Sequence, residues 1–162
     1  QLLHWMDEHF VNLMLTMEKN IMLKVHTEFS QMFQRWFGLL VDNGIIKVRL
    51  DDSFSPVIEQ NGFETEYEFL SGGEKTAAAL AYRLALNQVI NNIMSTINTK
   101  DLIILDEPTD GFSTEQLDRL RSLFAELDVS QLIIVSHEQK VESFVDNVIR
   151  LSKTEHVSRV TG

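Results

Sequence analysis

The stretch Leu102-Ile103-Ile104-Leu105-Asp106-Glu107-Pro108-Thr109 decides the fold of this chain. Four consecutive aliphatic residues predict a short strand that is buried on both faces, and two carboxylates mark its carboxyl end. Asp106 and Glu107 repel each other there, so they require a cation or a catalytic task. One of them can hold Mg²⁺ through water while the other activates an attacking water molecule. The alternative is an acidic turn without chemistry.

A second apolar run, Leu132 to Val135, is followed directly by Ser136 and His137. The pattern between the two runs predicts a helix at about residues 114–127, which gives a strand–helix–strand unit with parallel strands. Open sheets of this kind bind ligands at the carboxyl ends of their strands. We therefore expect His137 to contact a phosphate. The alternative is an ordinary hydrogen-bonded histidine.

The third motif is Ser71-Gly72-Gly73-Glu74-Lys75, which lies between a predicted strand and a predicted helix. Its glycines let the backbone approach a ligand closely. The start of the helix offers unpaired N–H groups and the positive end of the helix dipole to a phosphate. The alternative is a plain capping box, in which Ser71 pairs with Glu74 three residues later.

The remaining pattern predicts an α/β lobe with a mostly parallel core sheet that is buried on both faces. A long helix is expected to be covered on every side, because Ala77 to Ala81 are all apolar. The predicted elements are strands at 46–50, 66–69, 147–151 and 156–160, helices at 74–97 and 139–145, and a turn at Asn61-Gly62.

Residues 1–41 carry apolar side chains at gaps of three and four from Leu3 to Leu40, which is the helical period. A helix of this length reaches roughly 60 Å at ~1.5 Å per residue, too long for a compact domain. Its apolar stripe starts with heptad spacing and is widened by a second ridge that includes Trp5 and Met14. We interpret residues 1–41 as the base of a coiled coil that enters a globular lobe, residues 42–162. The alternative is an oversized core helix.

Composition excludes several classes of protein. The 162 residues contain no cysteine, which excludes disulfides and thiolate metal sites in this segment. No apolar run is long enough to span a membrane, and none has the form of a signal peptide. The net charge of −10 argues against a surface that is basic all over, so a nucleic-acid contact needs a local patch or a basic partner domain.

The three motifs, in this order and over about residues 68–149, resemble the signature motif, the Walker B strand and the switch histidine of ATP-binding-cassette ATPases. A coiled-coil helix before Ser-Gly-Gly-Glu-Lys is similar to the SMC-like group. Within it, Asp-Glu-Pro-Thr followed by Ser-His-Glu most resembles the double-strand-break-repair ATPases, the archaeal and eukaryotic counterparts of bacterial SbcC. SMC proteins proper rank second. A transporter subunit ranks third, because transporters do not place such a helix before this region.

The resemblance implies two heads that sandwich ATP between them. In one head Asp106 supports Mg²⁺, Glu107 polarises the attacking water and His137 contacts the γ-phosphate. The opposite head contacts the same ATP in trans. The residues implied for that contact are Ser71, Gly72, Gly73 and Glu74, and those implied for the dimer-contact loop are Asp110, Gly111 and Ser113. The family commonly has Asp where this chain has Ser113, which can still cap the next helix with Gln116.

The phosphate-loop motif Gly-x-x-x-x-Gly-Lys-Ser/Thr does not occur in the 162 residues. We therefore expect a C-terminal half that hydrolyses no ATP until it is combined with the N-terminal half of the same protein. The resemblance also implies a homodimer of heads, a metal-dependent nuclease that docks at Leu3, Phe10 and Met14, and DNA in the full complex. It implies the cytoplasm or nucleoid, or the nucleus in a eukaryote. The rival function is a non-catalytic coiled-coil head with a vestigial ATP site.

Overall fold

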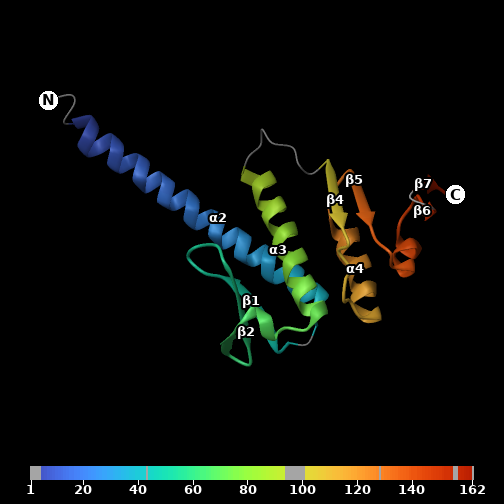
Figure 1. Cartoon of the computed structure of the whole chain (residues 1–162). Coiled ribbons are helices and arrows are strands. Elements are labelled where there is room, and N and C mark those ends of the chain that lie inside the picture. Colours follow the sequence, from blue (N-terminus) through green and yellow to red (C-terminus); the bar gives the residue numbers. More distant parts are fainter. Residues whose placement is uncertain (1–4, 43, 94–100, 128, 155–156, 162) are drawn as a thin grey trace.

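The computed structural model describes residues 5–42, 44–93, 101–127, 129–154 and 157–161 (Figure 1). Its elements in chain order are η1 (Met6–Phe10), α2 (Val11–Leu40), β1 (Ile46–Leu50), β2 (Pro56–Gln60), β3 (Phe63–Thr65), η2 (Tyr67–Phe69), α3 (Gly72–Ile93), β4 (Leu102–Asp106), α4 (Thr114–Glu126), β5 (Gln131–Val135), η3 (Gln139–Phe144), β6 (Leu151–Thr154) and β7 (Val157–Val160). The described strands form three separate sheets, β1-β2-β3, β4-β5 and β6-β7.

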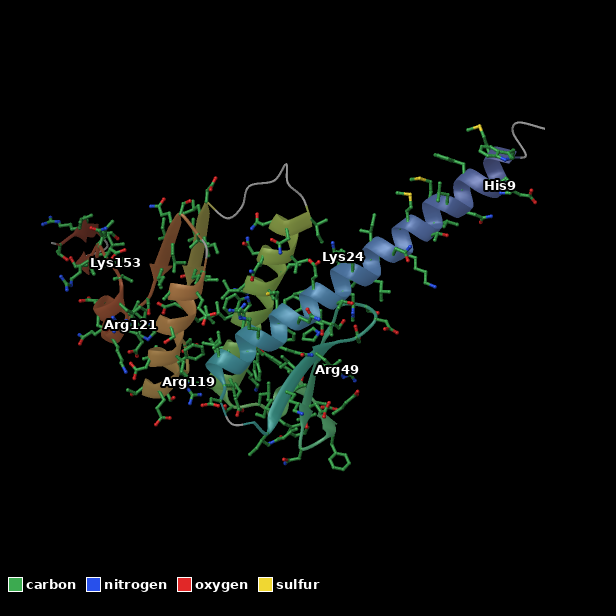
Figure 2. All side chains as sticks on the ribbon, turned by 180° about the vertical axis from the view of Figure 1, so that it is seen from behind. His9, Lys24, Arg49, Arg119, Arg121 and Lys153 are labelled. Carbon is green, nitrogen blue, oxygen red and sulfur yellow. The ribbon has the colours of Figure 1, made fainter. Side chains whose placement is uncertain are left out.

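Helix α2 has two different halves. Its carboxyl-terminal half enters the core, where it buries five large side chains, Phe29, Phe33, Trp36, Phe37 and Leu40. Its amino-terminal half extends away from the rest of the molecule (Figure 1), as Figure 2 also shows from behind, and it leaves its apolar side chains exposed. The predicted long helix is therefore present and ends at Leu40, one residue before the expected limit. The predicted start of the stripe at Leu3 lies outside the described residues.

Strands β1, β2 and β3 form an antiparallel meander beside α2. Alternate residues of β1 are buried, as the period of two predicts. Asn61 and Gly62 have φ values of 53° and 84°, and such paired positive values are typical of a two-residue hairpin turn between β2 and β3. The predicted strand at 66–69 is wrong. Tyr67–Phe69 form a 3₁₀ turn, because Phe69 and Leu70 donate backbone hydrogen bonds to residues three positions earlier.

Helix α3 packs along the buried half of α2. Small residues such as Ala77, Ala81 and Ala85 are fully buried at this contact, and small side chains allow two helices to approach closely. Tyr82 adds ring contacts to α2, with its centroid 4.9 Å from that of Phe29. The prediction that this helix is covered all round is wrong in detail, because Ala79 is exposed. Its predicted end near Ile97 lies outside the described residues.

Strands β4 and β5 pair in parallel, as the two apolar runs predict. One face of this pair packs against the core, through residues that include Ile103, Leu105 and Leu132. The other face is exposed, with relative exposures of 45% for Leu102, 61% for Ile104, 40% for Ile133 and 51% for Val135. The prediction of a sheet buried on both faces is therefore wrong for this chain. A continuous apolar run indicates that both faces of a strand are to be covered, but it does not tell which chain covers them.

The carboxyl-terminal region differs from its prediction in the placement of the strands. Residues 147–150 are not in a strand, and β6 begins only at Leu151 and pairs antiparallel with β7. The predicted short helix at 139–145 is present as the 3₁₀ segment η3. Within the described residues, no helix combines the length and the hydropathy needed to cross a bilayer.

Candidate functional site

The loop after β4 holds Glu107 in a backbone conformation that is rare for a residue with a side chain, with φ at 45°. The N–H of Glu107 donates to the carbonyl oxygen of Val135 at 2.8 Å, which continues the β4–β5 pairing by one residue. Asp106 is exposed and Glu107 is half-buried, whereas the sequence predicted a buried strand end. The difference follows from the open face of β4–β5, to which Asp106 belongs by register.

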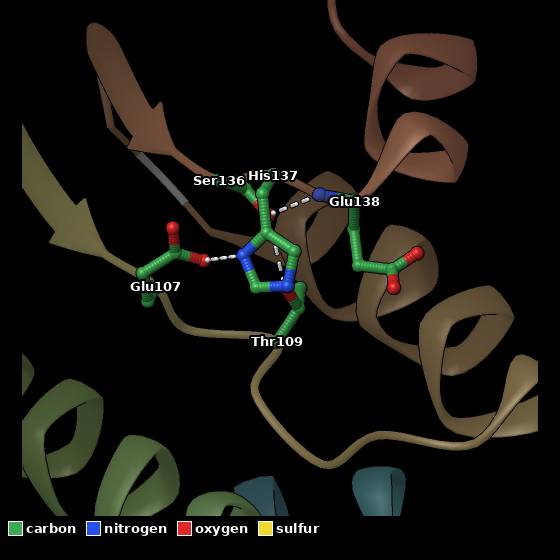
Figure 3. Close-up of polar contacts among 5 residues, drawn as sticks. All are labelled: Glu107, Thr109, Ser136, His137 and Glu138. Carbon is green, nitrogen blue, oxygen red and sulfur yellow. Dashed lines mark hydrogen bonds and ion pairs between the residues drawn. The ribbon is translucent and has the colours of Figure 1, made fainter.

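Glu107 and His137, which lie 30 residues apart in sequence, meet at the carboxyl ends of the two strands (Figure 3). The distance between His137 Nδ1 and Glu107 Oε2 is 2.9 Å. This hydrogen bond and the charge of Glu107 raise the pKa of His137 above its usual 6.5, aided by Glu138 and Asp110. The structure thus brings together the two residues that the sequence predicted to be catalytic. His137 contacts this carboxylate within the chain, where the sequence predicted a phosphate.

A pair of hydroxyl groups lies beside these two residues (Figure 3). Thr109 Oγ1 and Ser136 Oγ are 3.0 Å apart, and Ser136 Oγ also accepts a hydrogen bond from the backbone N–H of Glu138 at 3.1 Å. Thr109 is only 2% exposed. Both residues belong to motifs of the sequence analysis, but the sequence predicts no role for either of them. The missing signal was the register of β4 against β5, which places the two loops side by side.

Ser71 and the first turn of α3 form the capping box that is the alternative interpretation of the sequence. The backbone N–H of Ser71 donates to Glu74 Oε2 at 2.8 Å, and the N–H of Glu74 donates to Ser71 Oγ at 3.3 Å. Ser71 and Gly72 are exposed, whereas Gly73 is buried. Lys75 Nζ donates to the carbonyl oxygen of Glu68 at 3.0 Å, which braces the turn. The amino-terminal end of α3 therefore faces solvent in a fixed conformation.

The loop that follows Pro108 packs directly against this turn. A β-carbon added to Gly73 would lie 2.5 Å from Gln116 Oε1 and 2.8 Å from the carbonyl oxygen of Gly111. Gly111 itself has φ at 73°, and a β-carbon there would lie 3.2 Å from the carbonyl carbon of Gly72. Ser113 and Gln116 form the second predicted capping box, at the start of α4. The residues predicted for the signature motif and for the dimer-contact loop, Asp110 to Ser113, thus lie in neighbouring segments.

A cavity of about 400 Å³ lies between α3 and β4. Its polar side chains carry both signs of charge: Lys75 and Arg83 come from α3, and Asp106 and Glu107 come from the end of β4. Its apolar lining includes Leu102 and Ile104, the exposed face of the strand. Asp106, the predicted Mg²⁺ ligand, and Glu107, the predicted activator of water, thus line a cavity. The cavity is large enough for part of a ligand or of a second lobe.

The described residues hold no cluster of three or more His, Cys, Asp or Glu that could bind a metal ion. The carboxylates of Asp106 and Glu107 still fit Mg²⁺. This ion keeps several water ligands and is usually bound by one or two carboxylates together with substrate phosphates. Asp106 is exposed at the end of β4 and can reach such an ion through water. Asp106 and Glu107 are therefore the side chains that could hold such an ion, together with phosphate oxygens from a nucleotide.

The exposed half of α2 carries a shallow apolar groove. Its lining residues are Phe10, Val11, Met14, Leu15, Met17, Glu18, Ile21 and Met22. Phe10 is 50% exposed and Met14 is 49% exposed. Two of the three residues predicted for partner binding are therefore on one groove, and the third, Leu3, lies outside the described residues.

No protein-family model matches the chain. The chain is 33% identical over 151 residues to the DNA double-strand break repair Rad50 ATPase of Thermococcus kodakarensis, which covers 89% of this chain and 16% of that protein. It is 34% identical over 152 residues to the protein of the same name from Archaeoglobus fulgidus, with 88% and 16% covered. The chain thus spans about a sixth of the length of these curated relatives.

Among solved structures, the fold is similar to two SMC head domains. The first, from Pyrococcus furiosus with an extended coiled coil and bound to the C-terminal domain of ScpA, has a TM-score of 0.73 at 23% identity, over 94% of this chain and 38% of that one. The second, from Pyrococcus yayanosii with a coiled coil and joint, has a TM-score of 0.73 at 22% identity, over 94% and 30%. The chain is thus homologous to a part of the DNA double-strand break repair Rad50 ATPases, and it has the fold of SMC head domains with a coiled coil.

Proposed function

We propose that this chain combines with a lobe that carries a phosphate loop to form an ATP-hydrolysing head, which dimerises around ATP and acts in double-strand-break repair. The observation that carries the proposal is the Glu107–His137 pair beside Asp106, at the carboxyl ends of two neighbouring parallel strands. Ligands of open parallel sheets bind at this edge. Residues 1–41 would form the base of the coiled coil and residues 42–162 the carboxyl-terminal lobe.

Two features support a requirement for a second lobe. The 162 residues lack the loop whose backbone N–H groups and lysine hold the phosphates of a nucleotide. The β4–β5 pair also leaves one apolar face exposed, with Ile104 61% accessible to solvent. A lobe that packs on this face would bury it and would bring its phosphate loop to Asp106 and Glu107.

In the completed head, ATP would supply the phosphoryl group, and a bound Mg²⁺ would neutralise charge on the phosphate oxygens. Asp106 would orient water ligands of the ion. Glu107 would accept a hydrogen bond from the attacking water and hold it in line, which is the task of a general base in such reactions. His137 would exchange its contact with Glu107 for a contact with the γ-phosphate. Charge and position, rather than covalent chemistry, are what the residues contribute.

The turn before α3 would contact the ATP of the opposite head. Ser71 Oγ accepts a hydrogen bond from the N–H of Glu74, which leaves its own O–H to donate to a phosphate oxygen. Gly72 is exposed beside it, and Gly73 and Gly111 hold the turn against the loop of residues 110–113. Both segments would therefore meet the partner head as one surface, with Asp110 and Ser113 at its edge.

The exposed half of α2 would pair with a returning coiled-coil helix and with a nuclease, because its apolar side chains surround more of the helix than one partner can cover. DNA would be bound by other parts of the full complex, because the net charge of −10 on this chain does not favour contact with DNA phosphates. The proposed location is the cytoplasm or nucleoid, or the nucleus in a eukaryote. An SMC-type chromosome ATPase is the second candidate, favoured by the similarity of the fold to SMC heads.

The test mixes the purified chain with the half that carries the phosphate loop. We expect no ATP hydrolysis by either half alone and Mg²⁺-dependent hydrolysis by the mixture. Glu107→Gln is the matched control, because it keeps the size of the side chain while it removes the base. We expect ATP binding to persist and the rate to fall by about 10²- to 10⁴-fold. Hydrolysis by the single chain, or equal rates with Glu107→Gln, would contradict the proposal.

A further inference from the structure

Two hydrogen bonds besides the Glu107–His137 contact join the carboxyl-terminal ends of β4 and β5 and the loops that follow them. Figure 3 draws one of the two, between Thr109 and Ser136. The first is the backbone hydrogen bond from the Glu107 N–H to the carbonyl oxygen of Val135. The second is the hydrogen bond between the hydroxyl groups of Thr109 and Ser136, 3.0 Å apart. Each residue of the hydroxyl pair is two or fewer positions from one of the two side chains proposed to act on ATP.

Among the residues that the structure describes, Thr109 is the one buried residue with a hydroxyl group, at 2% exposure. A buried hydroxyl costs free energy unless it is hydrogen-bonded, so this group must keep a partner. Ser136 supplies that partner and, with the same oxygen, accepts the N–H of Glu138. The second bond spans His137 and closes the short turn that carries it. Through Ser136, the Thr109 hydroxyl therefore holds the whole turn of residues 136–138 in place.

By contrast, the two side chains of the Glu107–His137 contact are open to solvent. The side chain of His137 is 72% exposed and that of Glu107 is 41% exposed. An exposed ion pair holds its own geometry poorly, because the entropy of two mobile side chains opposes a weak attraction in water. The 2.9 Å contact thus needs support from the backbone on both sides.

We propose that Thr109 and Ser136 are positioning residues, whose hydrogen bond holds His137 in register with Glu107. The inference deepens the proposed function and rests on it for the link to ATP hydrolysis. Its structural part, that the hydroxyl pair sets the distance between His137 and Glu107, stands on this chain alone.

The first test follows the imidazole of His137 by NMR in the nucleotide-free chain, with His137→Gln to assign its signal. Thr109→Val keeps the shape of the side chain and removes the hydroxyl. We expect the pKa of His137 to fall toward its usual value in this variant, and Thr109→Ser to restore it. The acidic groups that face His137 are Glu107, Glu138 and Asp110, and all three are retained. An unchanged pKa in Thr109→Val, or no recovery in Thr109→Ser, would overturn the proposal.

Ser136→Ala is the second variant, and it decides the matter if Thr109→Val does not fold. It should lower the pKa of His137 at least as far, because it removes the bond to Thr109 and also the bond from the Glu138 N–H. The double variant should therefore add little to Ser136→Ala. Additive shifts would overturn the proposal.

The second test measures hydrolysis by the reconstituted head. A reacting group displaced by about 1 Å can cost on the order of 10²-fold in rate, so we expect Thr109→Val to lower kcat by about 10- to 100-fold with little change in KM. If the wild-type mixture hydrolyses no ATP, the proposed function fails while the NMR result still decides the positioning role. If it hydrolyses ATP and Thr109→Val is as fast, the positioning role fails and the proposed function stands.

Discussion

The carbonyl oxygen of Gly111 lies 2.8 Å from the point where a β-carbon on Gly73 would stand. No side chain fits there without moving backbone, because the obstacle is a main-chain atom and real β-carbons do not approach so closely. Gly73, the buried glycine in the first turn of α3, is therefore required because this turn contacts the loop before α4. Gly72, its neighbour, has no atom within 4 Å of such a position.

We expect Gly73→Ala to lower the free energy of unfolding by about 1–3 kcal/mol, the usual cost of overpacking a close contact. Gly72→Ala is the matched control and should change the stability by less than about 1 kcal/mol. Chemical denaturation of both variants measures the difference. Equal stability of the two variants would show that the backbone around Gly73 and Gly111 can move apart at little cost in free energy.

Ser71→Arg tests whether the exposed Ser71 does more than cap α3. In the proposed dimer, the arginine side chain would occupy the place of the partner head's γ-phosphate. We therefore expect normal ATP binding by the reconstituted head but no ATP-dependent dimer. Ser71→Thr retains a capping hydroxyl and should preserve dimerisation. Sedimentation with a non-hydrolysable ATP analogue separates the two variants. A normal dimer with Ser71→Arg would mean that Ser71 is a helix cap alone.

Glu107 stores backbone strain, since a non-glycine residue at φ of 45° costs on the order of 1–3 kcal/mol. We compare Glu107→Gly with Glu107→Ala, because both remove the carboxylate and its contact with His137. Only glycine relieves the strain, so the glycine variant should be more stable by about 1 kcal/mol. Thermal or chemical unfolding measures this. A glycine variant that is less stable than the alanine variant would show that the conformation at Glu107 costs little.

The Glu107–His137 pair predicts a specific dependence on pH. Glu107 raises the pKa of His137 in the folded chain, so the pair stabilises the fold fully below the unfolded value of 6.5. That stabilisation is lost as the pH rises through the higher, folded pKa. Glu107→Gln removes the charge and should bring the pKa of His137 down toward 6.5. An NMR titration of both proteins checks the shift, and equal values would contradict the pairing in solution.

The sequence predicts the elements of this fold where one periodicity dominates. The runs at β4 and β5 and the long stripe of α2 leave little choice, since each pattern fits one kind of structure. Alternation over 66–69 was misleading, because Tyr67 and Phe69 remain exposed and no strand is there to pair with them. A pattern of alternating residues cannot tell whether a neighbouring strand is present to pair with the segment.

The candidate site was predictable in its residue types and less so in its contacts. Asp106, Glu107 and His137 stand out because polar residues end apolar strands. The bond between Thr109 and Ser136 depends on the register of one strand against another, which no local pattern encodes. The exposed face of β4–β5 was missed for a related reason. Hydrophobicity indicates that a face is to be covered but does not tell whether the cover belongs to the same chain.

The groove on the exposed half of α2 supports the last prediction. Phe10 and Met14 lie one helical turn apart on it, each about half exposed, and aromatic and Met side chains are enriched at protein interfaces. The double substitution Phe10→Glu with Met14→Glu would put two charges into this groove, where any apolar partner must remove them from water. We expect binding of the proposed nuclease partner to fall by at least about 10-fold in a pull-down or titration, while ATP binding by the reconstituted head stays unchanged.

The matched control for this surface is Asn12→Glu with Thr16→Glu, which adds the same charge to the same turns of α2 outside the residues that line the groove. Both sites are exposed, so the fold should tolerate the change equally. We expect this control to retain nuclease binding, since the groove itself is untouched. If both double variants lose binding alike, charge on the helix rather than the groove decides the interaction. If neither loses it, the groove serves only the coiled-coil partner, and the nuclease docks elsewhere.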